Sequence, residues 1–378
     1  MKIALVHDYL NEFGGAERVL LALSEIYPQA PIYTIYARKS SKAYQEFKDK
    51  KIVESWFACL PFSDKLISPL RFLVPFIWGT FDFKDFDLVI TSASWGITKG
   101  MRNAKLEICY LHTPPRYLYG YETSRNWQNK WYGGLVKIYA LIVNHFLRIY
   151  DFKKAQTVDY FIVNSQNVGQ RVEKFYRRKD YQVIYPPVEI KKFLKIKEKI
   201  LKAKVEIQKN DYYLTGGRMT AAKNFDLIIK ACQKAEVVLK IFGTGVEEKN
   251  LKKLAGKNVH FLGSISDQEL TRHYQGAKAF ILAQKDEDFG ITSVEAAAAG
   301  TPVVAYRGGG YLESITEGKT GVFFDELTVE SLTKVIKRFN QMKWDKRVLQ
   351  NHAKKFSNER FKIEIKDFVK KHARITRS

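Results

Sequence analysis

Short apolar runs alternate along the chain with longer segments of helical periodicity. Strands that are apolar throughout and separated by helices are typical of parallel sheets covered on both faces. The expected strands are Ile3–Val6, Ile32–Tyr36, Leu88–Thr91, Leu106–Leu111, Tyr160–Val163, Val183–Tyr185, Tyr212–Thr215, Val237–Phe242, His260–Leu262, Ala279–Leu282, Val303–Ala305 and Gly321–Phe324. The clearest helical segments between them are Ala16–Ile26, Phe225–Lys234 and Ser293–Ala299. This alternation, present twice over, predicts an α/β fold of two doubly wound, Rossmann-like domains.

Two consecutive prolines mark the predicted domain boundary. Pro186 and Pro187 follow the last strand of the first half, and proline cannot continue a helix. A lysine-rich stretch at 191–209 leads to the next strand. We therefore expect domains at 1–187 and 188–355, and a basic terminal helix at 356–378 that crosses back to the first domain.

The charge is strongly positive and uneven. Lys and Arg number 63 against 40 Asp and Glu, a net charge of +23, and residues 101–200 alone carry +11. Such a field attracts nucleic acid, anionic lipid or anionic substrates. The segments Leu66–Phe81 and Leu135–Tyr150 are too interrupted to span a membrane. With the aromatic residues Trp127, Trp131, Tyr132 and Tyr139 they form either an amphipathic membrane-contacting surface or core-facing helices.

The cysteines and the N-terminal residues indicate the cellular compartment of the protein. Cys59, Cys109 and Cys232 are scattered and odd in number, so neither a disulfide framework nor a zinc knuckle is expected. Met1–Val6 enters a strand with no cationic leader. Both features predict a cytoplasmic protein.

The most informative stretch is 286–302, where a strand leads into an acidic loop and an alanine-rich helix follows. Gly290 permits close backbone approach, and the amides that open the helix form an anion site. Glu287 precedes the helix and Glu295 lies inside it. The first carboxylate can accept hydrogen bonds from sugar hydroxyls and the second from a ribose. The alternative is a surface loop followed by an ordinary helix glutamate.

Two further turns between a strand and a helix carry candidate ligand groups. Arg218 and Lys223 flank the turn after the first strand of the second half, and two cations suit a diphosphate, although solvated Arg and Lys are common. Gly14 and Gly15 follow the first strand of the chain and let a ligand approach backbone amides. No GxGxxG, GxxxxGK[ST], HExxH or CxxC motif occurs, and the segment 85–87 is interpreted as a turn and not as a metal site.

Together these segments resemble the retaining glycosyltransferases of family 4, which have the two-domain GT-B fold with the domains facing a cleft. The resemblance covers nearly the whole chain and is strongest from Gly216 to Phe324, where it includes the two glutamates with seven residues between them. The run His-Thr-Pro-Pro-Arg-Tyr at 112–117 is most similar to the O-antigen mannosyltransferase branch. Asp288 departs from the family pattern, which has a small residue there.

The resemblance implies a role for each matching residue. His112 and Glu287 would be the catalytic residues beside the transferred sugar. The donor-binding residues would be Gly14, Gly15, Arg218, Lys223, Ser264, Ile265, Phe289, Gly290, Ile291 and Glu295. A lone histidine after a strand is more often structural, so the assignment of His112 depends on the family match.

The expected function is transfer of a hexose with retention of configuration, without metal or other cofactor. The resemblance favours mannose from GDP-mannose as the donor, and a lipid-linked or polysaccharide glycan acceptor bound by the first domain. The basic surface suggests contact with the anionic inner face of a membrane. A sugar-nucleotide epimerase of the same fold is the alternative. A nucleic-acid-binding protein is disfavoured because no recognition motif is present.

Overall fold

The computed structural model describes residues 1–121, 133–193 and 211–375. These residues form two compact units. The first contains 1–121, 133–187 and 358–375, and the second contains 188–193 and 211–357. The chain passes from the first unit to the second directly after Pro187, and its last helix belongs to the first unit.

The first unit is built on a seven-stranded sheet in which every pairing is parallel. The strand order is β3-β2-β1-β4-β5-β6-β7. The bounds are β1 Ile3–His7, β2 Ile32–Thr34, β3 Ile52–Glu54, β4 Leu88–Ala93, β5 Glu107–Leu111, β6 Tyr160–Val163 and β7 Tyr181–Val183. The sequence pattern missed β3, which is an edge strand of three residues beside a lysine-rich turn. It placed β7 two residues late, because the apolar signal continues through Ile184 into the residues before the prolines.

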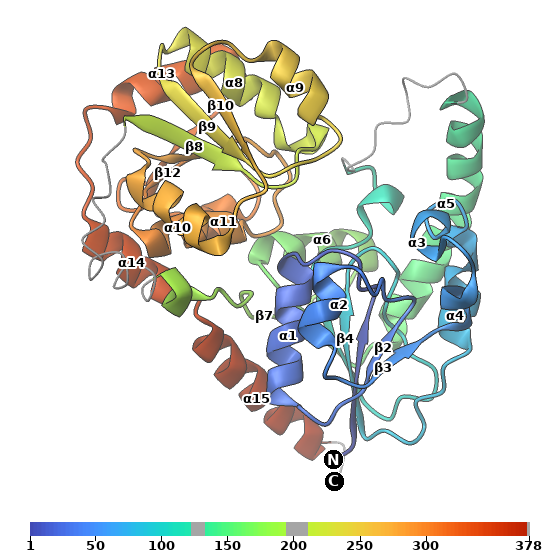
Figure 1. The fold of residues 1–378 in the computed structure, drawn as a ribbon. Helices are drawn as coiled ribbons and strands as arrows, with labels where there is room; N and C mark the ends of the chain where they lie inside the picture. The colour runs from blue at the N-terminus through green and yellow to red at the C-terminus, as the bar shows by residue number, and fades with distance from the viewer. Residues whose placement is uncertain (122–132, 194–210, 376–378) are drawn as a thin grey trace. The chain divides into compact units, whose positions relative to one another are not determined.

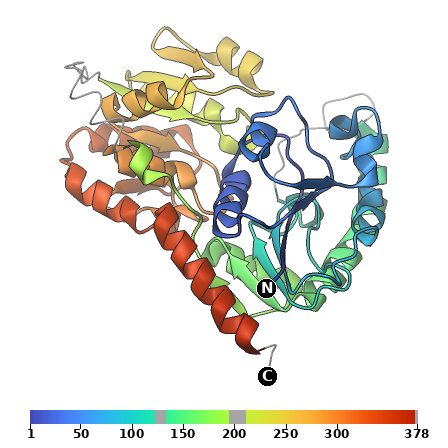
Figure 2. The same ribbon diagram turned by 60° about the horizontal axis from the view of Figure 1, so that its bottom comes forward.

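Helices cover both faces of this sheet (Figure 1). On one face, α15 (Asn358–Ile375) packs against α1 (Gly15–Ile26), and its Phe361 and Ile365 are buried with Leu20 and Leu23. Figure 2 shows α15 as the last, red helix of the chain. The other helical elements of the unit are α2 Lys42–Phe47, η1 Trp56–Cys59, α3 Ser63–Leu66, η2 Arg71–Leu73, α4 Val74–Gly79, η3 Arg116–Leu118, α5 Gly133–Thr157 and α6 Gln166–Tyr176.

The second unit repeats the plan with six parallel strands in the order β10-β9-β8-β11-β12-β13. Their bounds are β8 Tyr212–Gly216, β9 Val238–Phe242, β10 Val259–Gly263, β11 Phe280–Leu282, β12 Val303–Tyr306 and β13 Gly321–Phe324. The helical elements are η4 Ala221–Lys223, α8 Phe225–Lys234, α9 Glu248–Leu254, α10 Asp267–Gly276, α11 Ile291–Ala299, α12 Tyr311–Ser314, α13 Val329–Phe339 and α14 Lys346–Lys354. α11 is enclosed in the core, because Val294 and Ala296–Ala299 are all buried.

In each sheet the strand order reverses at one point. Strand order runs outward one way from β1 and the other way from β4, and the same reversal lies between β8 and β11. In open α/β sheets, ligands bind beside the carboxyl ends of the strands at such switch points. The topology therefore directs attention to the loops after β1 and β4, and to those after β8 and β11.

No helix within 1–121, 133–193 or 211–375 is long and apolar enough to cross a bilayer. The segment Leu66–Phe81 forms the end of α3, then η2 and α4, and Leu135–Tyr150 lies within α5. Trp127, Trp131, Tyr132 and most of the lysine-rich stretch 191–209 lie outside the described residues.

Candidate active site

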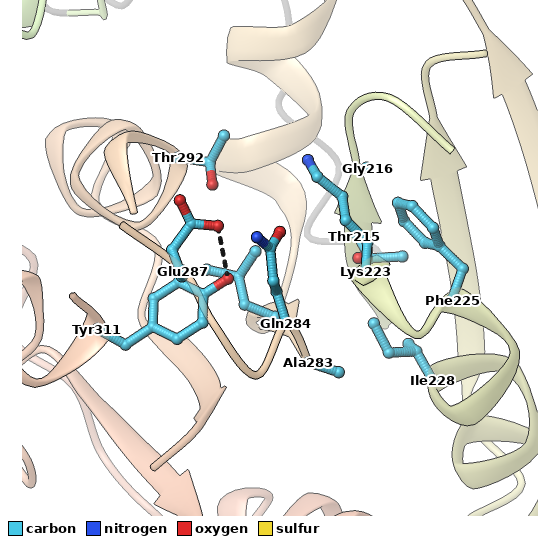
Figure 3. A pocket seen from close by; sticks show the side chains of 11 residues that line it. Thr215, Gly216, Lys223, Phe225, Ile228, Ala283, Gln284, Glu287, Thr292 and Tyr311 are labelled. Carbon is cyan, nitrogen blue, oxygen red and sulfur yellow. Dashed lines mark hydrogen bonds between the residues drawn. The ribbon is translucent and has the colours of Figure 1, made fainter. Parts of the chain in front are cut away.

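A hollow lies at the carboxyl ends of β8 and β11 in the second unit, at the switch point of its sheet (Figure 3). In Figure 3 the side chains of Lys223, Gln284, Glu287 and Thr292 extend toward one space. The lining residues come from β8, η4, α8, β11 and the loop after it, α11 and α12: Thr215, Gly216, Lys223, Phe225, Ile228, Leu282, Ala283, Gln284, Glu287, Thr292 and Tyr311.

One wall of the hollow is the turn between β8 and α8, which positions Lys223. Gly217 has a φ of +115°, and a Cβ at this position would lie 2.7 Å from the Lys223 Nζ. Any larger residue would therefore displace the ammonium group. Asn224 ends the turn and its Nδ2 donates to the carbonyl oxygen of Ala283 at 2.8 Å, which ties the turn to the end of β11. Lys223 is thereby held at the junction of the two strand ends.

The charge on Lys223 is set by the groups around the hollow. Burial lowers the pKa of the Lys223 ammonium from its ordinary value, Arg218 acts in the same direction, and the carboxylates of Glu287 and Glu295 oppose them. A partly desolvated cation gains when an anionic ligand enters, because the ligand replaces the lost solvation. Lys223 is thus suited to hold a negatively charged group.

The opposite wall carries Glu287, in the loop after β11. The Tyr311 hydroxyl donates to its Oε2 over 3.4 Å, and the Gly310 amide donates to its backbone carbonyl oxygen at 2.9 Å. The glycine loop after β12 therefore supports both the backbone and the side chain of Glu287. This arrangement leaves the carboxylate facing the hollow from a fixed loop.

The N-terminus of α11 completes the hollow. Gly290 precedes the helix with a φ of +90°, and a Cβ there would lie 2.8 Å from the Tyr311 ring. Ser293 Oγ donates to the Gly290 carbonyl oxygen at 2.7 Å and lies 2.8 Å from Ser314 Oγ. The first turn contains no acidic residue, so the positive end of the helix dipole is not neutralised locally. An anion in the hollow would meet both this helix end and Lys223.

Arg218 and Glu295, also predicted for this unit, differ in exposure. Arg218 is exposed at the rim of the turn. Glu295 is only 5% exposed, on the second turn of α11. Glu295 is therefore not a solvent-exposed residue of the helix surface.

Phe289 and Ile291 flank Gly290. The Phe289 ring is buried with its centroid 5.3 Å from that of Phe356, so only its backbone is available to a ligand. Ser264 and Ile265 follow β10, two strands from β8 in the same sheet, and they do not line the hollow.

The predicted residues of the first unit also lie at strand ends. Gly14 and Gly15 open α1, but the Gly14 amide donates to Glu17 Oε2 at 2.8 Å and is therefore engaged within the chain. His112 follows β5 and is 8% exposed. Its Nε2 lies 2.8 Å from Ser92 Oγ, and burial together with nearby His7 lowers the pKa of His112 to about 3. His112 is therefore a neutral imidazole.

Gln284, Thr292 and Tyr311 are among the lining residues that sequence reasoning did not assign to the site. Gln284 directly follows β11, where a ligand-facing residue is expected once the strand end is known. Tyr311 follows the glycines 308–310, a signal of the same kind as Gly14-Gly15. Among the described residues, no group of three or more His, Cys, Asp or Glu side chains is arranged to hold a metal ion.

Part of the chain is similar to known glycosyltransferases. Residues 196–358 match the family model described as "Glycosyl transferases group 1". The chain is similar to the mannosylfructose-phosphate synthase of Agrobacterium fabrum, with 30% identity over 134 residues covering 31% of this chain. It is also similar to the GDP-mannose-dependent alpha-(1-6)-phosphatidylinositol monomannoside mannosyltransferase of Mycolicibacterium smegmatis, with 30% identity over 136 residues covering 32% of this chain. These alignments span 30% and 36% of the two relatives.

A solved structure extends the likeness to both units. The Anabaena HepE structure in complex with UDP and glucose matches with a TM-score of 0.66 and 18% identity, and covers 98% of this chain and 99% of that chain. The fold is GT-B. The match to the group 1 model lies in the second half of the chain, whereas the likeness in fold extends over nearly all of it. The predicted pair of Rossmann-like domains is confirmed as two parallel-sheet α/β units.

Proposed function

We propose that this chain is a nucleotide-sugar glycosyltransferase, which transfers a hexose to a glycan acceptor with retention of the anomeric configuration. The observation that carries the proposal is the hollow of the second unit, which combines a half-buried lysine, a helix N-terminus and a carboxylate. The first two suit a diphosphate and the third suits sugar hydroxyls. The group 1 family match over 196–358 supports the same assignment.

Each group has a task in the proposed reaction. Lys223, Arg218 and the α11 amides stabilise the negative charge on the departing diphosphate, a role that a divalent cation has in other transferases. Glu287 and His112 hold the sugar while positive charge develops at its anomeric carbon. The bond from this carbon to the diphosphate breaks and the bond to the acceptor oxygen forms on the same face, while the leaving phosphate takes the acceptor's proton. The reaction so described requires no metal ion.

We propose mannose from GDP-mannose as the donor. The Mycolicibacterium relative is named as GDP-mannose-dependent, and the Agrobacterium relative as a mannosylfructose-phosphate synthase. HepE, by contrast, binds UDP and glucose, so UDP-glucose is the competing donor. A thermal-shift panel of GDP-mannose, UDP-glucose and other nucleotide sugars distinguishes them, because a bound ligand raises the unfolding temperature by mass action.

We further propose a lipid-linked or polysaccharide acceptor, presented to the enzyme at an anionic membrane surface. Support comes from α5, whose exposed face carries apolar residues in a stripe at helical spacing. Leu135 is 72% exposed and Phe146 is 66% exposed. The stripe consists of Leu135, Ile138, Leu141, Ile142, Phe146 and Ile149.

The charges around this stripe favour an anionic partner. Lys137, Arg148 and Lys153 are exposed on α5, whereas Asp151, its one carboxylate, is fully buried beside Lys99. An apolar stripe with basic flanks binds an anionic bilayer interface. A second copy of the chain would instead bring the same positive charges together. The membrane is therefore the partner that we propose.

Activity with an added acceptor tests the reaction. We expect sugar transfer from the preferred donor to a polyprenyl-diphosphate-linked glycan, with the product keeping the donor's anomeric configuration by NMR. An epimerase would convert the donor with no acceptor present. Donor conversion that does not depend on the acceptor would therefore contradict the proposal.

A further inference from the structure

A buried chain of polar side chains crosses the carboxyl edge of the first unit's sheet. His7 ends β1, Ser92 lies opposite it in β4, and His112 follows β5. Ser92 Oγ lies 3.1 Å from His7 Nδ1 and 2.8 Å from His112 Nε2. One hydroxyl therefore joins two imidazole rings, and all three side chains are buried.

The series of connected polar side chains continues to the helix that follows β1. His7 Nε2 lies 3.5 Å from Glu17 Oε1, while Glu17 Oε2 accepts the Gly14 amide. Glu17 thereby connects His7 to the glycine loop. Backbone contacts hold His112 at the other end, since its amide donates to Ala93 and its carbonyl oxygen accepts from Asn164 Nδ2 at 2.9 Å.

The number of protons available allows two hydrogen-bonding states of these polar side chains. A hydroxyl has one proton, so Ser92 donates to one ring and accepts from the other. When His7 is neutral, Glu17 retains the proton on His7 Nε2, and His7 Nδ1 accepts from Ser92. Ser92 then accepts from His112 Nε2–H, which leaves a lone pair on His112 Nδ1.

Protonation of His7 reverses the direction of both hydrogen bonds of Ser92. Both His7 nitrogens then donate, and Nδ1–H donates to Ser92 Oγ. Ser92 in turn donates to His112 Nε2, so the proton of the neutral His112 ring must sit on Nδ1. Among the described residues, Ser92 is the one hydrogen-bond partner of the His112 ring, so Nδ1 remains available to a ligand.

We propose that Glu17, His7 and Ser92 form a relay that sets which ring nitrogen of His112 carries its proton. The relay thus determines whether His112 offers a sugar hydroxyl a donor or an acceptor. The role toward sugar rests on the proposed function, whereas the relay itself does not. Glu17, His7 and Ser92 are positioning residues, which act through His112.

The charged groups around His7 set the pH at which the relay changes state. Burial alone lowers the pKa of His7, but the hydrogen bond and charge of Glu17, the charge of Asp8 and the contact with Ser92 outweigh it and raise this pKa above its ordinary value. His112 stays neutral over the same range, because burial and His7 lower its pKa to about 3. Its ring can therefore exchange tautomers without becoming charged.

Long-range ¹H–¹⁵N NMR of the imidazoles tests the relay on the intact chain without substrate. In the wild type we expect the proton of His112 to move from Nδ1 to Nε2 with rising pH, at the midpoint of the His7 titration. Glu17→Gln should shift both midpoints together to lower pH, by about 1 to 3 units, because an opposing charge is lost. Glu25→Gln, on the same helix but paired with Lys362, is the control and should shift neither.

Substitutions of Ser92 test the hydroxyl directly. Ser92→Ala should uncouple the His112 tautomer from the His7 titration, and Ser92→Thr should restore the coupling. A His112 ring that keeps one tautomer throughout the His7 titration would overturn the relay, as would an unchanged exchange in Ser92→Ala. Glu17→Gln leaves Ser92 in place, so it tests the relay independently if Ser92→Ala does not fold.

Kinetics then separate the relay from the proposed function. With a donor that turns over, kcat/KM should change at the His7 midpoint, and Glu17→Gln should move this change to lower pH. A purely structural role of Glu17 would lower activity at every pH without moving the change. If the NMR coupling is present but no nucleotide sugar binds, the relay stands and the proposed function fails.

Discussion

The side chains of Tyr311 and Glu287 join the segments that follow β12 and β11 in the candidate site. The Tyr311 hydroxyl donates to Glu287 Oε2 over 3.4 Å, across 24 positions of sequence. A carboxylate has about four lone-pair positions, so one hydrogen bond from a phenol does not exhaust its capacity to accept others. Glu287 can therefore be held in place and still accept a hydrogen bond from a sugar.

The two glutamates should have different kinetic roles. Glu287→Gln keeps the size of the side chain and removes the charge that faces the developing oxocarbenium ion. We expect it to lower kcat more than it raises the donor KM, since this interaction strengthens in the transition state. Glu295→Gln should mostly raise the donor KM, because a ribose contact is the same before and during reaction. Steady-state kinetics measure both.

Tyr311→Phe tests the contact between Tyr311 and Glu287. It keeps the ring beside Gly290 and removes the hydroxyl that donates to Glu287. We expect a smaller loss of kcat than in Glu287→Gln. Wild-type kinetics in Glu287→Gln would remove the support for its catalytic role.

Diphosphate binding should depend on Arg218 and Lys223. Loss of a hydrogen bond to a charged group costs about 1.5–3 kcal/mol, so each alanine variant should weaken nucleoside diphosphate binding roughly tenfold to a hundredfold. Lys230→Ala is the control, because Lys230 is exposed on α8 and paired with Asp226 at 3.7 Å. Isothermal titration calorimetry with GDP and UDP measures the affinities. Unchanged affinity in both Arg218→Ala and Lys223→Ala would refute the assignment.

Metal independence is a separate prediction. If Lys223, Arg218 and the α11 amides balance the diphosphate charge, turnover should survive excess EDTA. The assay compares initial rates with EDTA, with added Mg²⁺ and with added Mn²⁺. Loss of activity on chelation and its recovery with either ion would contradict this prediction. Asp286 and Asp288, beside Glu287, would then be the first residues to reconsider as ligands.

Membrane binding should depend on the apolar stripe of α5. Replacing Ile138 and Phe146 together by Ser removes two exposed apolar side chains, each worth about 1.5–3 kcal/mol when fully buried. We expect at least a tenfold loss of co-flotation with anionic vesicles. Ile363→Ser is the control, since Ile363 is 60% exposed on α15 of the same unit. Equal binding by the double variant and the wild type would exclude this surface.

Stability should fall with rising pH because of Glu107. Burial raises the pKa of Glu107 to about 7, despite the amides of Met101 and Gly100 that donate to it. The folded state therefore holds this proton more tightly than the unfolded state, whose glutamate titrates near pH 4.5. The contribution is fully present below pH 4.5 and is lost as the pH rises through 7, a change of about 3 kcal/mol in the free energy of unfolding.

Glu107→Gln isolates this effect, because glutamine does not titrate. The difference between the unfolding free energies of wild type and variant should change by about 3 kcal/mol between pH 4.5 and pH 8 in urea denaturation. Parallel curves for the two proteins would show that Glu107 has an ordinary pKa.

Local pattern was sufficient for most of the fold. The strands at 160–163 and 321–324 and the helix at 225–234 have the predicted bounds, because apolar runs, helical periodicity and flanking glycines act over neighbouring residues. β3 escaped prediction, since three residues at a sheet edge bury little and leave a weak hydrophobic signal. Its pairing with β2 supplies the stability that its own sequence does not indicate.

The candidate site was predictable to the extent that it depends on single turns. Glu287 and Lys223 stand beside strand ends that the pattern identifies, and the structure brings them together around one hollow, with Gly290 at the start of the helix that contributes Thr292. Tyr311 comes from a different loop, and only the pairing of β11 with β12 places it over Glu287.

The sequence by itself determined the elements, the two parallel-sheet domains and the residue types at each strand end, because these follow from short-range periodicity and turn chemistry. Only the tertiary structure decided which strand ends meet. His7 and Ser92 are 85 residues apart in the chain, yet they are direct partners in the β1–β4 register. Strand pairing is a long-range property, since every backbone offers the same hydrogen bonds and the packing of whole side-chain layers selects among them.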